Sequence, residues 1–185
     1  MSAESLAGRR TTLRPLAEAD AGPLLEAVAS SRAQLKRRFG WVESAVGAED
    51  MLRFVRARAE AWSAGSASTF GMFEARTGKL LGVLSLDHIQ RETLKAELSL
   101  WVRGDEQDKG FAVEAGRLAV EYAFKKLALH RLYARIDPVN RSARKVLQRL
   151  GFRYEGCLRG DRRLNGRWVD QECWAMMRSE WRSSK

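Results

Sequence analysis

A polar turn in the middle of the chain carries the residues that point most clearly to chemistry. The turn consists of Gln107, Asp108, Lys109 and Gly110, and a helical pattern follows with Phe111 and Ala112. The first N–H groups of a helix have no partner within it and the helix dipole is positive there, so this position favours a phosphate group. Gly110 lets an oxygen approach the backbone closely, and Lys109 adds positive charge. We therefore expect a pyrophosphate site between Gln107 and Ala112, although an ordinary capped turn would use the same residue types.

Strands and helices must position this turn, and the hydrophobic pattern predicts where they lie. Apolar residues recur at helical spacing in four segments, and seven shorter segments are strand-like. The helices are expected at about 19–30, 47–62, 111–127 and 140–150, and the strands at 11–16, 69–75, 80–89, 96–102, 130–136, 152–159 and 168–177. Pro15 favours a sheet edge for the first strand. The order predicts an α/β (α+β) domain, with a mixed sheet and helices packed on it.

Length and composition restrict the possible classes of protein. The 185 residues fit one domain, and 33 Lys+Arg against 23 Asp+Glu give a net charge of +10, which attracts polyanions such as nucleic acid, ribosomes or a phosphorylated cofactor. No apolar stretch is long enough to span a bilayer, and residues 1–5 lack the basic start and apolar run of an export signal. Cys157 and Cys173 stand at no metal-binding spacing. We expect a cytoplasmic protein with no metal and no membrane association.

Two motifs resemble one known family. Gln107-x-x-Gly110-x-Ala112 resembles the Q/R-x-x-G-x-G/A signature of the GNAT superfamily of acetyl-coenzyme A-dependent N-acetyltransferases. About thirty residues downstream, the run from Asn140 to Phe152 resembles the family's N-x-x-S-x-x-V-L-x-x-L-G-F helix. The resemblance covers about residues 9–178. It implies a single GNAT-like domain over residues 1–185, a mostly antiparallel sheet that is splayed at the cofactor site, helices on both faces, and acetyl-CoA as cofactor.

Further matches look like one subgroup of that family, the Rim-type enzymes that acetylate the N termini of ribosomal proteins. The matching positions are Leu13-Arg14-Pro15-Leu16 with Asp20, Glu97 before Trp101, and Glu155-Gly156-Cys157 with Leu164-Asn165. This likeness implies an α-amine of a protein as acceptor.

The resemblance also implies which residues contact the cofactor. Leu100, Trp101 and Val102 would bind the pantetheine arm through their backbone groups. The pyrophosphate would be surrounded by Gln107, Asp108, Lys109, Gly110, Phe111 and Ala112. Asn140 would hydrogen-bond the arm near the thioester, Ser142 would contact the thioester, and Lys145, with Arg144, would serve the phosphates.

The catalytic residues implied by the resemblance are Glu97, Ser142 and Tyr154. Glu97 matches a carboxylate of the subgroup and is the expected general base, although an exposed strand glutamate would read the same way. Ser142 is a candidate acid, but the family usually has serine one position later, where Ala143 stands, and a serine near a helix start often caps it. Tyr154 could protonate the leaving thiolate or simply pack against the sheet. The two cysteines are expected to be buried structural thiols, so direct transfer is favoured over an acyl-enzyme.

Trp41, His88 and Asp161 are the candidates for acceptor binding. Trp41 matches an aromatic segment that borders the acceptor site in the family, His88 follows Asp87 in a strand, and Asp161 stands one position before the place where the subgroup can carry an acidic residue, which Arg162 occupies here. A Trp at such a position is as often a lid over the core.

Three functional readings remain open. The first is an N-acetyltransferase for the N-terminal α-amine of a protein, possibly a ribosomal one, and the second is the same chemistry on a small amine. The third is a basic RNA- or ribosome-binding module without catalysis, which the arginines of 140–150 would serve; no nucleic-acid signature supports it, so we expect nucleic acid only through association with a ribosome. A monomer and a homodimer are both compatible with the sequence.

Overall fold

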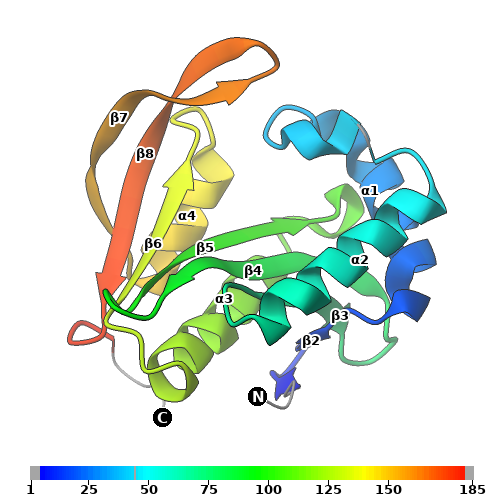
Figure 1. Ribbon diagram of the computed structural model, residues 1–185, viewed down its shortest axis with the longest axis horizontal. Helices are drawn as coiled ribbons and strands as arrows, with labels where there is room; N and C mark the ends of the chain where they lie inside the picture. Colours follow the sequence, from blue (N-terminus) through cyan, green and yellow to red (C-terminus); the bar gives the residue numbers. More distant parts are fainter. Residues whose placement is uncertain (1–4, 44, 182–185) are drawn as a thin grey trace.

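The computed structural model describes residues 5–43 and 45–181, and its centre is one eight-stranded sheet (Figure 1). The strands are β1 Leu6–Ala7, β2 Thr11–Pro15, β3 Ser68–Glu74, β4 Leu80–Gln90, β5 Lys95–Val102, β6 Arg131–Ile136, β7 Arg153–Leu164 and β8 Arg167–Met177. Their order is β1-β2-β3-β4-β5-β6-β8-β7, and every pair is antiparallel except β5 with β6. The predicted fold class is confirmed, and the sheet is mixed and not closed.

Helices cover both faces of the sheet. The α-helices are α1 Ala21–Leu35, α2 Ala48–Ser63, α3 Phe111–Glu121 and α4 Arg141–Leu150, and short 3-10 segments are η1 Glu18–Asp20, η2 Gly40–Glu43 and η3 Gly104–Glu106. In Figure 1, α1 and α2 lie in front of the sheet, and α3 lies behind it. Alternating strand residues feed two cores: Leu84 and Leu86 pack with α3, whereas Val83 and Trp101 pack with α1 and α2.

Several predicted boundaries differ from the structure, for identifiable reasons. The helix expected at 111–127 is α-helical only to Glu121 and continues as a π turn, η4 Tyr122–Lys126, in which the Leu127 N–H donates to the Tyr122 carbonyl at 3.1 Å. The loop expected before the last strand is a two-residue turn, since Asn165 and Gly166 have φ of +49° and +79° and β7 runs on to Leu164.

The first predicted strand, β2, is not the outermost one. β1 pairs with it through Leu13 and Thr12, so Pro15 lies beyond the Leu6 end of β1 and faces no described strand on that side. Proline is tolerated there because no partner needs its missing N–H. Arg14, also on β2, donates two hydrogen bonds to the Asp20 carboxylate, at 2.7 and 2.8 Å, and thereby fixes the entry into α1.

Two expectations concern the ends and the surroundings of the chain. The first is that residues 1–5 lack an export signal, and residues 1–4 of that segment lie outside the described part of the chain. Among the described residues, no helix combines the length and the apolar composition needed to cross a membrane. The same residues hold no group of three or more His, Cys, Asp or Glu arranged to bind a metal ion.

Candidate active site

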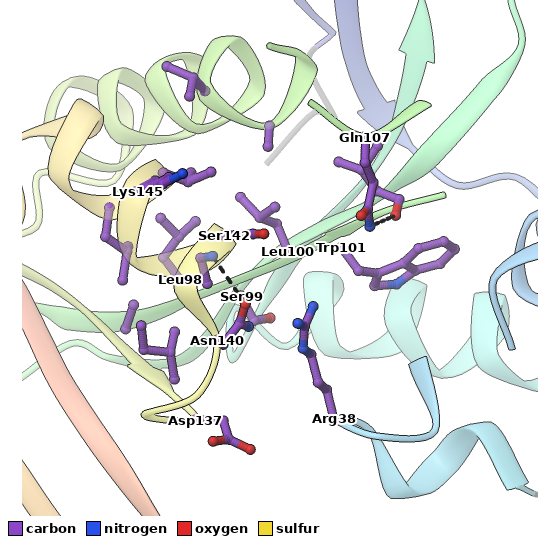
Figure 2. Close-up of a pocket in the computed structure, with 18 of the residues that line it drawn as sticks. Arg38, Leu98, Ser99, Leu100, Trp101, Gln107, Asp137, Asn140, Ser142 and Lys145 are labelled. Carbon is purple, nitrogen blue, oxygen red and sulfur yellow. Dashed lines mark hydrogen bonds between the residues drawn. The ribbon is translucent and has the colours of Figure 1, made fainter. Parts of the chain in front are cut away.

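β5 and β6 separate where the site begins. The two strands pair only over Lys95–Glu97 and Arg131–Tyr133, and β5 continues to Val102 beside β4 alone. A cavity of about 410 Å³, here called the first cavity, lies beyond the point of separation. Its walls come from β5, the starts of α3 and α4, the end of β6 and the loop after α1 (Figure 2). Backbone groups on the open side of β5 are therefore free of a strand partner and can face a ligand.

The start of α3 has the geometry expected of an anion cradle. Gly110 has φ +88°, which a side chain rarely adopts, and no heavy atom lies within 4 Å of the position that a Cβ would take. Among the described residues, the first N–H of α3 with an acceptor is that of Glu114, which donates to the Gly110 carbonyl at 3.2 Å. The N–H groups of Phe111, Ala112 and Val113 have no helical acceptor, and all three residues line the first cavity. This arrangement fits a pyrophosphate.

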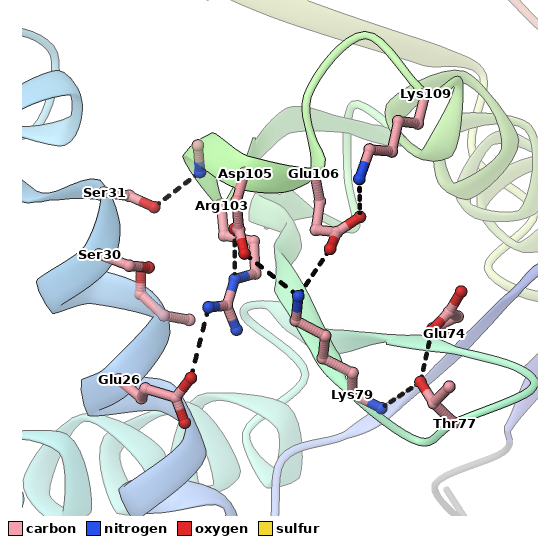
Figure 3. A network of polar contacts seen from close by, with 12 residues as sticks. Glu26, Ser30, Ser31, Glu74, Thr77, Lys79, Arg103, Asp105, Glu106 and Lys109 are labelled. Carbon is pink, nitrogen blue, oxygen red and sulfur yellow. Dashed lines mark hydrogen bonds and ion pairs between the residues drawn. The ribbon is translucent and has the colours of Figure 1, made fainter.

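Lys109 does not face this cradle, contrary to expectation. Its ammonium donates to one carboxylate oxygen of Glu106 at 2.8 Å. Lys79, in the turn between β3 and β4, donates to the other carboxylate oxygen at 2.6 Å (Figure 3). These hydrogen bonds, from Lys109 first and then Lys79, lower the pKa of Glu106. Lys109 therefore holds the turn in place from outside the first cavity. Gln107 does line the first cavity, and its amide donates to the Val102 carbonyl at 3.2 Å, which ties the turn to the end of β5.

The remaining predicted cofactor residues, apart from Arg144, all line the first cavity. They are Leu100, Trp101, Val102, Asp108, Gly110, Phe111, Ala112, Asn140, Ser142 and Lys145. Arg149 stands one helical turn after Lys145 on α4 and lines the first cavity as well. The basic side of α4 and the start of α3 thus border the same space, as phosphate groups would require.

Asn140, and not Ser142, caps α4. The Asn140 side-chain oxygen accepts a hydrogen bond from the Ala143 N–H at 3.1 Å, and Asn140 is buried in the wall of the first cavity. Ser142 is exposed to the first cavity, and its hydroxyl makes no hydrogen bond within the described part of the chain. The expectation that Ser142 serves as a cap is therefore wrong, and its hydroxyl is available to a ligand.

Arg144 has a structural role that the sequence did not indicate. Its guanidinium donates to both oxygens of Glu172, at 3.2 and 2.6 Å, and to the Pro138 carbonyl at 2.9 Å. Burial by itself would raise the pKa of Glu172, but hydrogen bonds from Arg144 and from the Trp174 indole outweigh it and lower that pKa. Arg144 therefore holds the turn that carries Asn140, and it does not line the first cavity.

The expected base, Glu97, is held in an ion pair outside the cavities described here. Arg135 donates to its two carboxylate oxygens at 3.1 and 2.8 Å, and the exposed His88 lies 3.3 Å from one of them. The same guanidinium reaches Asp161 at 3.2 Å. Neither Glu97, His88 nor Asp161 lines the first cavity, so these three residues form a charge cluster around Arg135 at the base of the split.

Tyr154 and the cysteines also lie away from the first cavity. Tyr154 is half exposed on β7, and its ring packs edge-on against Trp174 with the centroids 5.5 Å apart. Of the two roles considered for Tyr154, this contact matches packing against the sheet and not protonation of the thiolate. Cys157 is exposed, not buried as expected, because β7 is an edge strand, and Cys173 is partly buried, which raises the pKa of its thiol. Neither thiol lines the first cavity.

A second cavity, of about 350 Å³, lies on the α1–α2 side of the sheet and shares part of its wall with the first. Ser99, Leu100 and Trp101 line both. Trp41 lines the second cavity, where its ring stacks on Phe54 with the centroids 5.8 Å apart. The predicted place of Trp41 near the acceptor region is compatible with this geometry.

Asp87 is the carboxylate of the second cavity. It accepts hydrogen bonds from the hydroxyls of Ser85 and Ser99, at 2.7 and 3.1 Å, and from Arg58 at 3.2 Å. The sequence alone predicts no catalytic role for Asp87 or Ser99. A signal was present, since Ser85, Asp87 and Ser99 are polar residues at alternate positions of otherwise apolar strands, which places them on one face. Their facing partners are visible only once the strands are paired.

Comparison with known proteins gives related sequences of named activity. Residues 10–153 match a family model described as an acetyltransferase (GNAT) domain. The probable N-acetyltransferase YjcK of Bacillus subtilis (strain 168) is 38% identical over 109 residues, 58% of this chain and 60% of that protein. The [ribosomal protein uS5]-alanine N-acetyltransferase of Escherichia coli (strain K12) is 30% identical over 118 residues, 63% of this chain and 61% of that protein. The spermidine N(1)-acetyltransferase of the same strain is 33% identical over 91 residues, 49% of each.

The solved structures agree on the fold. Mycobacterium smegmatis RimJ, in complex with coenzyme A disulfide, superposes with a TM-score of 0.89 at 21% identity, over 97% of this chain and 90% of that one. The chain spans between 59% and 66% of the length of the first curated relatives that it matches. The family model, by contrast, covers most of the chain between β2 and the start of β7. On that match, the chain belongs to the GNAT acetyltransferase family.

Proposed function

We propose that this chain is an N-acetyltransferase that moves the acetyl group of acetyl-CoA directly to the α-amine at the N terminus of a protein. One observation carries the proposal: two cavities meet at Ser99, Leu100 and Trp101, at the point where β5 leaves β6. A donor in the first cavity and an acceptor approaching from the second would meet across this segment. Such juxtaposition can supply much of the acceleration of acyl transfer.

The groups that line the first cavity support its assignment to acetyl-CoA. Bound there, acetyl-CoA supplies an activated thioester. The N–H groups at the start of α3 would hold the pyrophosphate, with Lys145 and Arg149 beside it. The open edge of β5 at Leu100–Val102 would bind the pantetheine arm as an added strand, and the free amide donors of Asn140 would orient its thioester end.

Proton transfer is assigned to Asp87 acting through Ser99. An α-amine has a pKa of about 7.7–8.0, so it is mostly protonated near pH 7 but roughly a tenth of it is neutral, and it needs a weaker proton acceptor than a lysine amine does. Ser99 lines both cavities and donates to Asp87 at 3.1 Å, so its hydroxyl can take the amine proton while passing its own to the carboxylate. Asp87 rather than Glu97 fits this role, because Glu97 lines neither cavity.

The oxygen that gains charge during transfer needs a donor already in place. A backbone N–H of β5 near Leu100 is suited to this, since the strand has no partner on that side. The departing thiolate needs a proton, and the Ser142 hydroxyl stands in the wall of the first cavity without another hydrogen bond among the described residues. Direct transfer fits the positions of both cysteines, which lie outside that cavity.

The charges near the acceptor side favour a peptide over a polyamine. A polycation would need carboxylates at the cavity mouth, but Asp87 is already paired with Arg58, and Arg135 holds Glu97 and Asp161. The chain as a whole carries +10. Both charge patterns disfavour a substrate such as spermidine, which one relative's name mentions, and leave an α-amine as the better match.

The test is a panel of acceptors analysed by mass spectrometry. The purified chain is incubated with acetyl-CoA and either peptides with free N termini, the same peptides with blocked N termini, or spermidine and other small amines. We expect acetylation of the free N termini only. Acetylation confined to small amines, or confined to lysine side chains of blocked peptides, contradicts the proposal.

A further inference from the structure

Arg38 is a charged side chain that the proposed reaction leaves without a task. It follows α1 in the loop before η2, and its guanidinium reaches into the first cavity beside Asn140 and Ser99 (Figure 2). Within residues 5–43 and 45–181 this guanidinium has no hydrogen bond and no ion pair. Burial lowers the pKa of Arg38, and the nearby charge of Asp137 offsets only part of that effect. A desolvated arginine without a partner is costly unless a ligand supplies the anion.

Arg162 brings a second cation to the same place. It lines the first cavity from β7, and one of its terminal nitrogens donates to the backbone carbonyl of Arg38 at 2.7 Å. Its Nε is buried and has no hydrogen-bond partner in the described part of the chain. Two arginines from distant parts of the sequence thus line the first cavity and touch through the Arg38 backbone, and each guanidinium has donors without an acceptor among the described residues.

Further basic residues lie near these two arginines, as do the carboxylates of Asp137, which lines the same cavity, and of Glu43, 3.5 Å from the Lys36 ammonium. Lys36 and Arg37 precede Arg38, and the Lys36 carbonyl lies 3.5 Å from the Asn165 side-chain nitrogen in the β7–β8 turn. Exposed arginines of that hairpin are Arg159, Arg163 and Arg167. The loop after α1 and the tip of the β7–β8 hairpin therefore form a basic rim at this end of the first cavity.

The cofactor phosphates do not account for Arg38. In Figure 2, Arg38 and Asp137 lie on one side of the β5 segment, whereas Gln107 and Lys145 lie on the other. The groups suited to the pyrophosphate are at the start of α3 and on α4. Arg38 instead lies beside Ser99, which lines both cavities and where the acceptor amine would arrive (Figure 2), and Arg162 contacts the backbone of Arg38.

We infer that Arg38 and Arg162 form an anion subsite for the acceptor, so that the preferred acceptor carries a carboxylate or phosphate close to the amine that is acetylated. The inference rests on the proposed function and narrows its substrate class. For a protein acceptor, the anion is an acidic side chain directly after the N-terminal residue. For a small amine, it is the molecule's own carboxylate or phosphate. Two guanidinium donors suit both groups through paired, charge-assisted hydrogen bonds.

A pair of peptides that differ in one charge tests the subsite. Initial rates are measured for Ala-Glu-Ala-Ala amide and Ala-Gln-Ala-Ala amide at saturating acetyl-CoA. We expect kcat/KM to be about tenfold higher for the glutamate peptide, the size of one charge-assisted hydrogen bond. Arg38→Gln and Arg162→Gln should each remove most of this preference, mainly through KM, and Arg38→Lys should restore part of it.

Matched controls distinguish a direct contact with Arg38 from a general effect of the protein's positive charge. Arg37→Gln removes the same charge from the neighbouring exposed position, which does not line the first cavity, so it should keep the preference. Coenzyme A should bind Arg38→Gln and the unaltered chain with the same Kd in a calorimetric titration. Loss of coenzyme A binding in Arg38→Gln would assign the residue to the cofactor and overturn the inference.

Further acceptor pairs identify whether the anion belongs to a peptide or to a small molecule, and a binding measurement tests the subsite without requiring acetylation. Alanine against alaninamide, and phosphoethanolamine against ethanolamine, ask whether a small anionic amine is preferred to the peptide; either preference supports the subsite. Calorimetric binding of the N-acetylated peptide pair in the presence of coenzyme A reports the subsite even if no amine is acetylated, which would defeat the proposed function alone. Equal binding and equal kcat/KM for both peptides overturn the inference, as does RNA binding that Arg38→Gln abolishes while the peptides remain indistinguishable.

Discussion

The guanidinium of Arg135 holds both carboxylate oxygens of Glu97, at 3.1 and 2.8 Å, across the last paired residues of β5 and β6. The Glu97 side chain is only 14% exposed and Arg135 also reaches Asp161, so the three residues form a clasp below the point where the strands diverge. The side-chain hydrogen bond to Glu97 is the largest cause that raises the pKa of Arg135, which keeps this cation charged at every relevant pH. The clasp thus stabilises the pairing of β5 with β6 at the point beyond which the two strands separate and the first cavity begins.

Glu97→Gln is expected to weaken the fold and to leave the chemistry intact. The substitution removes a charge-assisted pair that is partly shielded from water, at a cost of about 1–2 kcal/mol in the free energy of unfolding. Denaturant titration measures this loss, with Glu155→Gln, which breaks the more exposed pair with Arg131, as the matched control. The pH profile of kcat/KM should not change. A selective loss of turnover at low pH with unaltered stability would restore Glu97 as the base.

Ser99→Ala and Ser85→Ala should differ sharply in activity. Both hydroxyls donate to Asp87, but only Ser99 also lines the first cavity. We expect Ser99→Ala and Asp87→Asn to lower kcat by about 10²-fold near pH 7 and by less near pH 9, where the α-amine is already neutral. Ser85→Ala should stay close to the unaltered chain. Equal, small effects of all three substitutions would remove Asp87 from the proton path.

Asn140→Ala and Ser142→Ala should separate capping from chemistry. Loss of the Asn140 cap is expected to lower the free energy of unfolding by about 1 kcal/mol, whereas Ser142→Ala should leave stability unchanged because its hydroxyl has no partner within the described residues. Thermal unfolding and kcat are measured for both. A Ser142→Ala variant with unaltered kcat would show that another donor protonates the thiolate.

The turn above α4 should respond to pH through Glu172. Its pKa is lowered in the folded state, so the carboxylate contributes stability above its unfolded pKa, about 4.3, and loses that contribution as pH falls through the folded value. Glu172→Gln should therefore be destabilised at pH 7, and its difference from the unaltered chain should shrink below about pH 4. Denaturant titrations across this range measure it. Glu60→Gln, at an exposed position of α2, is the control, and a difference that does not change with pH would refute the pairing.

Much of the fold could be predicted from local patterns. The alternation in β4 and β5 and the helical spacing in α2 and α3 reflect contacts with one core, so each segment carries its own signal. The sequence also predicts the anion cradle, because Gly110 and the start of α3 are neighbours in the chain. These parts depend on residues that are close in sequence.

Side-chain contacts between segments that are distant in the sequence could not be predicted. Lys79, in the β3–β4 turn, contacts Glu106 of η3 across 27 positions, Arg135 reaches Glu97 across 38, and Arg162 contacts Arg38 across 124. Side-chain charge alone does not reveal a partner, so the sequence predicts phosphate contacts for Lys109 and Arg144 and does not indicate their ion pairs with Glu106 and Glu172. The strand pairing that brings Ser99 to Asp87 had to be known before either residue could be given a role.

The most direct test of the whole account is calorimetric titration of coenzyme A into the chain and into two glycine variants. Gly110→Val and Gly78→Val impose similar backbone strain, since both glycines have positive φ, +88° and +71°, and open space where a Cβ would lie. Only Gly110 lines the first cavity. We predict saturable binding to the chain and to Gly78→Val, and binding weakened at least tenfold, about 1.4 kcal/mol, in Gly110→Val. No binding to the unaltered chain, or equal binding to both variants, would contradict the placement of acetyl-CoA in this cavity.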